Sequence, residues 1–205
     1  GALGFSPSRT IMHKAVDGEP VPGTYAAEDE LFGIGKVLGE LGYVTLGFDM
    51  RGCGDSEGEK GRVICLEQVE DTRNALTFLQ KHPAVHPERI AVVGSSFGGA
   101  VSVYTGGVDE RVAAVISNGG WGDGERKFRG QHKSPEEWAR FTKMLADGRE
   151  HRAKTGKSLM VPRYDIVPIP EKLRNRMSHG SIMEFPAETA QSMNDFRADD
   201  QVGNI

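Results

Sequence analysis

Short apolar runs alternate with amphipathic stretches over the first 120 residues of the chain. Leu31, Ile34 and Val37 illustrate the helical spacing of apolar residues in one such stretch. The run from Tyr43 to Asp49 is largely apolar, which is typical of a strand buried on both faces. This alternation favours an α/β fold, with a mostly parallel sheet covered by helices on both faces. The predicted order is a helix over 31–41, a strand over 43–49, a helix over 66–79, a strand over 90–95, a helix from residue 100 and a strand over 112–117.

The pattern changes beyond the last of these strands. Ser134-Pro-Glu-Glu137 is a capping box with proline at the first helical position, so it predicts a helix that runs to about Arg152. Pro186 predicts the start of a final helix that runs to about Phe196. No strand is expected in this second part of the chain.

A G-x-S-x-G motif lies at the junction between the strand predicted over 90–95 and the helix that follows. In Gly94-Ser-Ser-Phe-Gly98, we expect Ser96 at the apex of a sharp, strained turn, with its hydroxyl projecting from the end of the sheet. The flanking glycines lack Cβ atoms that would collide where strand and helix crowd together. The helix directs its first N–H groups at charge developing on a substrate, and the N–H of Phe97 would be one oxyanion donor. The motif therefore predicts a nucleophile elbow, with a glycine-serine loop without chemistry as the alternative.

The chain has 205 residues, of which 38% are hydrophobic and 26% charged, and its formal net charge is −4. These values predict one soluble globular domain. Mild acidity argues against a nucleic-acid or anionic-membrane partner, and no apolar stretch approaches the ~18 residues that span a bilayer. Cys53 and Cys65 form no metal-ligand pattern. The expectation is a reduced cytoplasmic protein, with a processed secreted protein as the alternative.

Three stretches together resemble the α/β-hydrolase superfamily. They are Gly-Tyr-Val-Thr-Leu-Gly-Phe-Asp-Met-Arg-Gly-Cys-Gly-Asp-Ser-Glu-Gly over 42–58, Leu-Glu-Gln-Val-Glu-Asp over 66–71, and the elbow. The chain is most similar to bacterial dienelactone-hydrolase-like and X-Pro-dipeptidyl-peptidase-like serine hydrolases. The resemblance implies an α/β-hydrolase fold and a Ser-His-acid triad with Ser96 as the nucleophile.

The first residues resemble the oxyanion turn of the same superfamily. Leu3-Gly-Phe-Ser6 is similar to the His-Gly-Phe-Gly turn that follows the third strand, and the N–H of Phe5 would be the second oxyanion donor. Leu3 departs from the usual histidine, and no strand is predicted ahead of this glycine-rich piece. An unstructured tail is the alternative.

The resemblance also implies residues that the sequence does not supply. In the superfamily the acid usually follows the seventh strand and the histidine the eighth, whereas this chain stops about where the seventh would begin. We interpret the chain as an internal fragment, incomplete at both ends. Its predicted parts are a hydrolase core over 1–120, a helical cap over 121–197 and a lead-in to a seventh strand over 198–205. For 121–197, the alternative is a set of peripheral helices packed on the sheet.

No other acid or histidine in the sequence is a strong triad candidate. Asp123 follows the sixth strand, where some α/β-hydrolases place the acid, and is the alternative acid. Asp49 and Asp55 favour a turn-stabilising role. His82 and His86 precede the elbow strand, at the opposite end from Ser96. No supporting motif accompanies the other histidines, and no pair has the spacing of a metal site; they are His13, His132, His151 and His179.

The expected function is a serine hydrolase that cleaves a small-molecule carboxylic ester, or an amide or peptide, through an acyl-enzyme on Ser96. No cofactor and no metal are expected, and no oligomeric state is predicted. An acyltransferase is one alternative, since it differs only in the acceptor that replaces water. A non-catalytic binding module of the same fold is another, because it would explain the absent histidine and acid.

Overall fold

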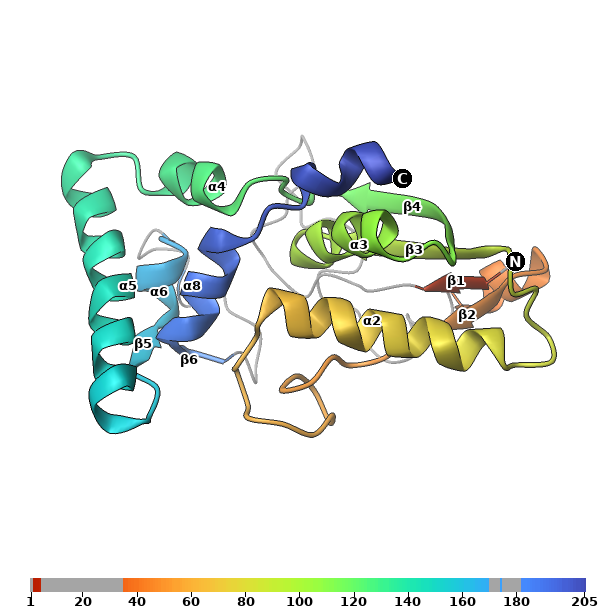
Figure 1. Ribbon diagram of the computed structural model, residues 1–205, viewed down its shortest axis with the longest axis horizontal. Coiled ribbons are helices and arrows are strands. Elements are labelled where there is room, and N and C mark those ends of the chain that lie inside the picture. The colour runs from red at the N-terminus through yellow and green to blue at the C-terminus, as the bar shows by residue number, and fades with distance from the viewer. Residues whose placement is uncertain (1, 5–34, 170–173, 175–181) are drawn as a thin grey trace.

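A computed structural model describes residues 2–4, 35–169, 174 and 182–205 of the chain. Four parallel strands form a sheet in the order β2-β1-β3-β4 (Figure 1). The predicted alternation of helix and strand is confirmed. In chain order the elements are β1 (Ala2–Gly4), a helix over 35–40, β2 (Val44–Leu46), α2 (Cys65–Gln80), β3 (Ile90–Ser95), α3 (Phe97–Val108) and β4 (Val112–Asn118).

The structure adds a short N-terminal strand, β1, within the glycine-rich piece ahead of which the sequence analysis predicts no strand. Leu3 pairs with Thr45 of β2 on one side and with Ala91 of β3 on the other, so β1 lies between them. Three residues, one of them glycine, are too few to show an alternating pattern, and both partners are distant in sequence. Because β1 is so short, β2 pairs over only three residues and is shorter than the strand predicted over 43–49.

The sheet carries helices on both faces, as predicted. On one face, Ile90 is fully buried against Leu76 of α2, and Leu46 packs on the same cluster. Alternation along β2 directs Thr45 to the opposite face. There the helix over 35–40 begins close by, since a Cβ on Gly35 would lie 3.5 Å from the Thr45 hydroxyl.

A second group of elements lies beside the carboxyl ends of the strands (Figure 1). Its core is apolar, with the fully buried rings of Phe128 and Phe141 4.7 Å apart. The elements of this group are α4 (Gly124–Gln131), α5 (Pro135–Thr155), β5 (Met160–Pro162), α6 (Arg163–Ile166), β6 (Glu184–Pro186), α8 (Ala187–Asp195) and the 3₁₀ helix η1 (Asp199–Asn204).

In the part of the chain that the structure describes, no helix has the length and apolar character needed to cross a membrane.

The capping box predicted for the long helix α5 is confirmed. The Ser134 hydroxyl accepts from the Glu137 N–H (3.1 Å), and the Glu137 carboxylate accepts from the Ser134 N–H (3.1 Å). The helix continues past the expected end at Arg152, because the first residue able to stop it is Gly156, which has a left-handed φ of 72°.

The prediction that this second group contains no strand was wrong. β5 and β6 form an antiparallel pair, with Val161 opposite Phe185. Each strand is three residues long and contains or adjoins proline, so neither shows a local strand pattern. Residues 199–204, expected to lead into a further strand, form η1 and pack on α3, where a Cβ on Gly107 would meet the Gln201 carbonyl oxygen at 2.4 Å.

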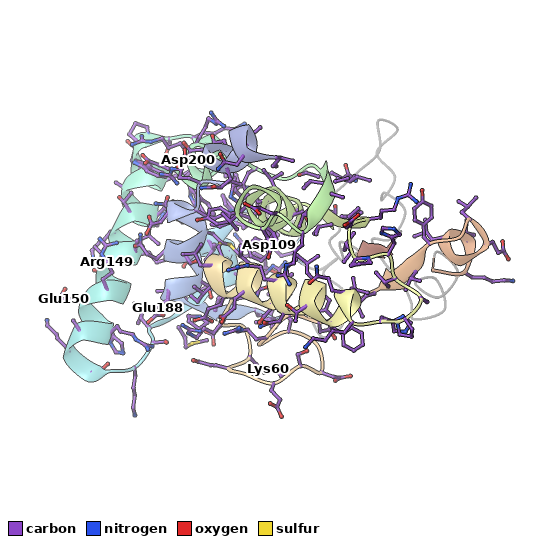
Figure 2. All side chains as sticks on the ribbon, turned by 45° about the vertical axis from the view of Figure 1, so that its right-hand side comes forward. Lys60, Asp109, Arg149, Glu150, Glu188 and Asp200 are labelled. Carbon is purple, nitrogen blue, oxygen red and sulfur yellow. The ribbon has the colours of Figure 1, made fainter. Side chains whose placement is uncertain are left out.

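An ion cluster centred on the buried Asp109 joins the end of α3 to α2 (Figure 2). The Asp109 side chain is 4% exposed and accepts from Arg111 (2.6 Å) and from Arg73 (3.0 Å). These hydrogen bonds, above all those from Arg111, outweigh burial and lower the pKa of Asp109 from 3.8 to about 2. The cluster therefore stabilises the fold only while the carboxyl is ionised.

We expect Asp109→Asn to lower the free energy of unfolding at neutral pH by about 2 kcal/mol, the usual contribution of hydrogen bonds to a charged group. Because the folded-state pKa is depressed, this stabilisation is complete above the unfolded pKa and is lost as the pH falls towards about 2. Urea unfolding should show wild type and variant converging over that pH interval. The control, Asp147→Asn, removes an exposed pair with Lys143 and should cost under about 0.5 kcal/mol. If the difference in free energy of unfolding between wild type and Asp109→Asn did not shrink as the pH fell towards about 2, this account would be contradicted.

Candidate active site

Ser96 joins β3 to α3 in a strained conformation. Its φ is 53° and its ψ −116°, and among the described residues it is the one non-glycine with positive φ. Such backbone conformations cost on the order of 1–3 kcal/mol and persist only where surrounding bonds enforce them. Here the Ser96 N–H donates to the Asn118 carbonyl (2.8 Å), and the Ser96 carbonyl accepts from the Ala100 N–H (3.2 Å). Both neighbouring elements therefore hold the turn that the motif predicts.

Close approach of backbone explains the glycines around this turn. A Cβ on Gly94 would lie 2.1 Å from the Gly98 carbonyl oxygen. On the other side of α3, a Cβ on Gly99 would lie 2.7 Å from the Ser117 hydroxyl, and one on Gly120 would lie 2.7 Å from the Ala100 nitrogen. The turn can therefore be this tight only with glycine at these positions.

Phe97 is the first residue of α3, and its ring stacks on Trp121 with the centroids 5.5 Å apart. Behind Trp121, the Lys127 ammonium lies 4.3 Å from the indole centroid and 3.9 Å from the centroid of the Phe128 ring. Removal from water lowers the pKa of Lys127 to about 8. Sequence reasoning did not single out this lysine, because it occupies an ordinary helical position without a motif.

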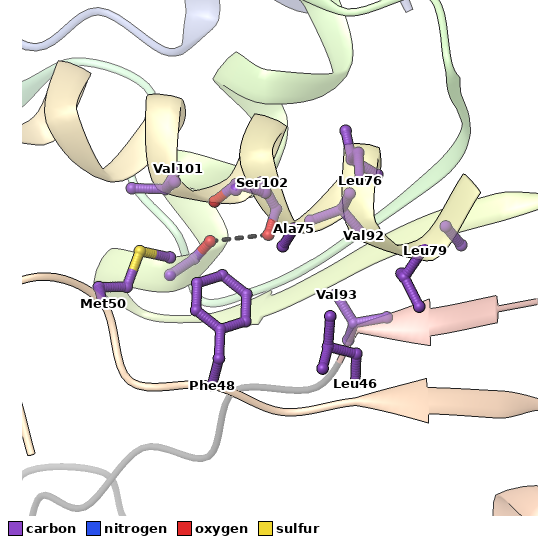
Figure 3. A pocket seen from close by; sticks show the side chains of 13 residues that line it. Leu46, Phe48, Met50, Ala75, Leu76, Leu79, Val92, Val93, Val101 and Ser102 are labelled. Carbon is purple, nitrogen blue, oxygen red and sulfur yellow. Dashed lines mark hydrogen bonds between the residues drawn. The ribbon is translucent and has the colours of Figure 1, made fainter. Parts of the chain in front are cut away.

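A small apolar cavity lies beneath the elbow (Figure 3). Its volume is about 50 Å³, and its lining includes Phe48, Met50 and Val101. The Ser102 hydroxyl, also in the lining, donates to the Gly98 carbonyl (2.8 Å). Ser96 does not line this cavity, which is large enough only for a water or two. We therefore interpret it as a packing void between α2, α3 and the sheet.

The structure gives the other candidate triad residues different roles. Asp123 is the N-cap of α4 and accepts from the Arg126 N–H (2.9 Å). His132 is buried in the second group, with Nε2 3.2 Å from the Ile166 carbonyl oxygen. Within residues 2–4, 35–169, 174 and 182–205, the Ser96 hydroxyl has no hydrogen-bond partner, and no cluster of acids, histidines and cysteines could hold a metal ion. His13, His179 and Phe5 lie outside the described residues.

The polar loop after β2 serves the fold. An Asp49 carboxylate oxygen accepts from the Asp55 N–H (3.4 Å), and a Cβ on Gly54 would collide with that same carboxylate. Arg51 then ties the loop to α2 through Asp71 (2.6 Å). These contacts agree with the turn-stabilising role predicted for Asp49, whereas Asp55 takes part through its backbone N–H. The Arg51 clamp was not foreseen.

Comparison with known proteins gives one family and several partial relatives. The family described as alpha/beta hydrolase fold matches residues 21–161, which is more than half of the chain. An uncharacterized 31.7 kDa protein of Escherichia coli is 32% identical over 122 residues, covering 60% of this chain and 42% of that protein. The polyketide transferase ATR5 of Stachybotrys chlorohalonatus is 43% identical over 77 residues, covering 37% of this chain and 26% of that protein. The thiohydrolase aneE of Aspergillus aculeatus is 37% identical over 83 residues, covering 40% and 26%.

The fold is shared with solved structures over nearly the whole chain. The crystal structure of the alpha/beta hydrolase GrgF from Penicillium superposes with a TM-score of 0.68 at 24% identity, covering 98% of this chain and 66% of that one. By contrast, the chain matches less than half of the length of each of the three relatives compared by sequence above. The finer resemblance to dienelactone hydrolases stays a prediction. With a family match over more than half its length and the corresponding parallel sheet and strained strand-to-helix turn, the chain belongs to the α/β-hydrolase fold family.

Proposed function

We propose that Ser96 is the nucleophile of an acyl hydrolase that cleaves a small-molecule carboxylic ester or thioester. The observation that carries the proposal is the strained backbone of Ser96 at the end of β3. Ser95, its neighbour in the same motif, belongs to the strand itself and pairs with Asn118. Strain that the surrounding hydrogen bonds maintain at one of two adjacent serines supports a functional reason for that position.

The chemistry follows from this placement. The Ser96 hydroxyl attacks the acyl carbon and gives its proton to a base, the alcohol or thiol leaves with a proton, and water then releases the acyl group from the serine. The N–H of Phe97 belongs to the first turn of α3, where helical N–H groups lack partners within the helix, and would hold the oxyanion. Phe5 follows β1, the neighbour of β3 in the sheet, and its N–H is the second proposed donor. The proposal requires that a histidine outside the described residues reach Ser96 in the intact protein.

The second group of elements is proposed to bound the substrate pocket as a cap over 121–197, on a core over 1–120. Trp121 supports this assignment, because it leads out of β4 and stacks directly on Phe97. The remaining residues, 198–205, follow the proposed cap and include η1, which packs on α3.

Relatives named as a thiohydrolase and as polyketide transferases support a thioester bond and make acyl transfer the second candidate function. The two reactions share the acyl-enzyme and differ in whether water or another nucleophile removes the acyl group. Adding a soluble alcohol or amine to the reaction distinguishes them, since a transferase forms the new ester or amide in preference to free acid.

A fluorophosphonate probe tests the nucleophile in the natural protein at its full encoded length. We expect one label per chain, which peptide mapping places on Ser96 and not on the adjacent Ser95. No label, or a label on another residue, would overturn the proposal and favour a binding module of the same fold.

A further inference from the structure

Lys127 places a positive charge where the described residues give it no negative partner. Its ammonium packs against the faces of Trp121 and Phe128 at 4.3 and 3.9 Å. Within the described part of the chain it has no ion pair, because the acids of the surrounding elements pair elsewhere. At the start of α4, Glu125 pairs with Arg129, and Asp123 accepts from the Arg126 N–H. On α2, Glu67 pairs with Arg62, whereas Glu70 and Asp71 both pair with Arg51. On α8, Glu188 pairs with Arg152, and Asp195 accepts from Gln191.

Trp121 supplies a second donor without an acceptor. Its indole Nε1 is buried and has no hydrogen-bond partner among the described residues. A buried N–H left unpaired costs on the order of 1–3 kcal/mol, so native proteins rarely keep one without a reason. Two side chains in contact, one of them charged, therefore each carry an N–H donor that has no acceptor among the described residues.

The position of these donors connects them to the elbow. Trp121 is three residues beyond the end of β4, and its ring stacks on Phe97, the residue after Ser96. Trp121 therefore contacts the first turn of α3 directly, and Lys127 is connected to it through the Trp121 ring.

We propose that the Lys127 ammonium and the Trp121 indole N–H bind an acceptor oxygen on the acyl chain of the substrate, either of a carboxylate or of a β-keto group. The inference rests on the proposed function and adds the class of acyl group. A cation held on aromatic faces keeps its ability to donate hydrogen bonds while most of its water is removed, which strengthens its attraction for such an oxygen. A lysine that serves only to hold α4 on the core would show no preference between acyl chains.

Matched acyl thioesters of N-acetylcysteamine test the inference in the natural protein at its full encoded length. Glutaryl is compared with valeryl, which has the same chain length without the carboxylate, and acetoacetyl is compared with butyryl. For the oxygenated member of at least one pair, Lys127→Met should raise KM by about 10- to 100-fold, the range expected for a charged hydrogen bond. The pair that responds identifies the oxygen. Trp121→Phe keeps a ring there and should raise the same KM by about 2- to 10-fold.

Two controls separate recognition from folding. Lys133→Met changes an exposed lysine just beyond α4 and should leave every KM unchanged. The rate of fluorophosphonate labelling should be the same in Lys127→Met as in wild type, since the elbow is intact. An equal change in all four substrates, or no change in any, would overturn this inference while leaving Ser96 as the nucleophile. Failure of the probe to label wild type would refute the proposed function instead.

The pH dependence gives a readout that a structural role would not produce. Besides the paired acids already named, the titratable group whose charge acts on Lys127 is Cys65 of α2, and burial raises its thiol pKa to about 11. The lysine is charged below about pH 8 and neutral above it, so the wild-type preference for the oxygenated thioester should decline as the pH rises through 8. Lys127→Met should show no such decline, and a decline in the variant equal to that of wild type would contradict the assignment.

Discussion

Replacing Ser96 by alanine should reduce the turnover of ester or thioester substrates by about 10⁴- to 10⁶-fold, as happens when a serine hydrolase loses its nucleophile. The reason is local: the only hydroxyl at the apex of the turn disappears, while the strained backbone and the Phe97 N–H remain. Release of thiol from an acyl thioester measures the effect in the natural protein at full length. The loss should appear in kcat, because the alanine variant still binds substrate.

Ser95 provides the matched control for this experiment. It is adjacent in sequence, has a similar partial exposure and lies in β3 with ordinary strand pairing. Ser95→Ala should therefore keep turnover within about tenfold of wild type, since it removes no group from the reaction. If Ser96→Ala kept turnover close to that of wild type, the acyl-enzyme mechanism would be wrong.

A glycine at the same position separates strain from chemistry. Ser96→Gly should abolish turnover as alanine does, yet it should raise the free energy of unfolding by about 1 kcal/mol, because glycine adopts positive φ without the Cβ penalty. Thermal unfolding of the three proteins measures this. A glycine variant less stable than the alanine variant would show that the turn is not strained.

Gly94→Ala should lower the free energy of unfolding by about 3 kcal/mol or more and abolish fluorophosphonate labelling. The new Cβ would lie 2.1 Å from the Gly98 carbonyl oxygen and 2.5 Å from the Ser102 hydroxyl. Backbone cannot yield as a flexible side chain does, so α3 must move away from β3, at the upper end of the cost of overpacking or beyond it. The shift would misplace Ser96 and the Phe97 N–H together. Urea unfolding and labelling of the same preparation measure both effects.

The control for this substitution is Gly130→Ala. Gly130 lies in α4, and a Cβ there would meet no atom within 4 Å. Alanine should therefore stabilise the protein slightly, by up to about 1 kcal/mol, through its better helix propensity. If Gly94→Ala were as well tolerated as Gly130→Ala, the close crossing of β3 and α3 would not exist in solution.

Local sequence was sufficient wherever the determining contacts lie within a few residues of one another. The elbow is such a case, because Gly94 and Gly98 approach each other across a single turn of five residues with Ser96 at its apex. The capping box of α5 is another, since Ser134 and Glu137 satisfy each other's N–H groups three residues apart. Strand β3 was predicted with its observed bounds, because a buried central strand shows a continuous apolar run.

Tertiary structure decided the features whose partners lie far apart in the chain. β1, β5 and β6 are three residues long, and each is a strand only because another segment supplies its hydrogen bonds. Asp109 and Arg73 form an ion pair across 36 residues, and no local pattern marks either of them. The sequence by itself therefore determined the family, the alternating fold and the serine to test. That the charge of Lys127 has no partner among the described residues depended on folding, because the acids of α2 and α8 form their ion pairs with other residues only in the folded chain.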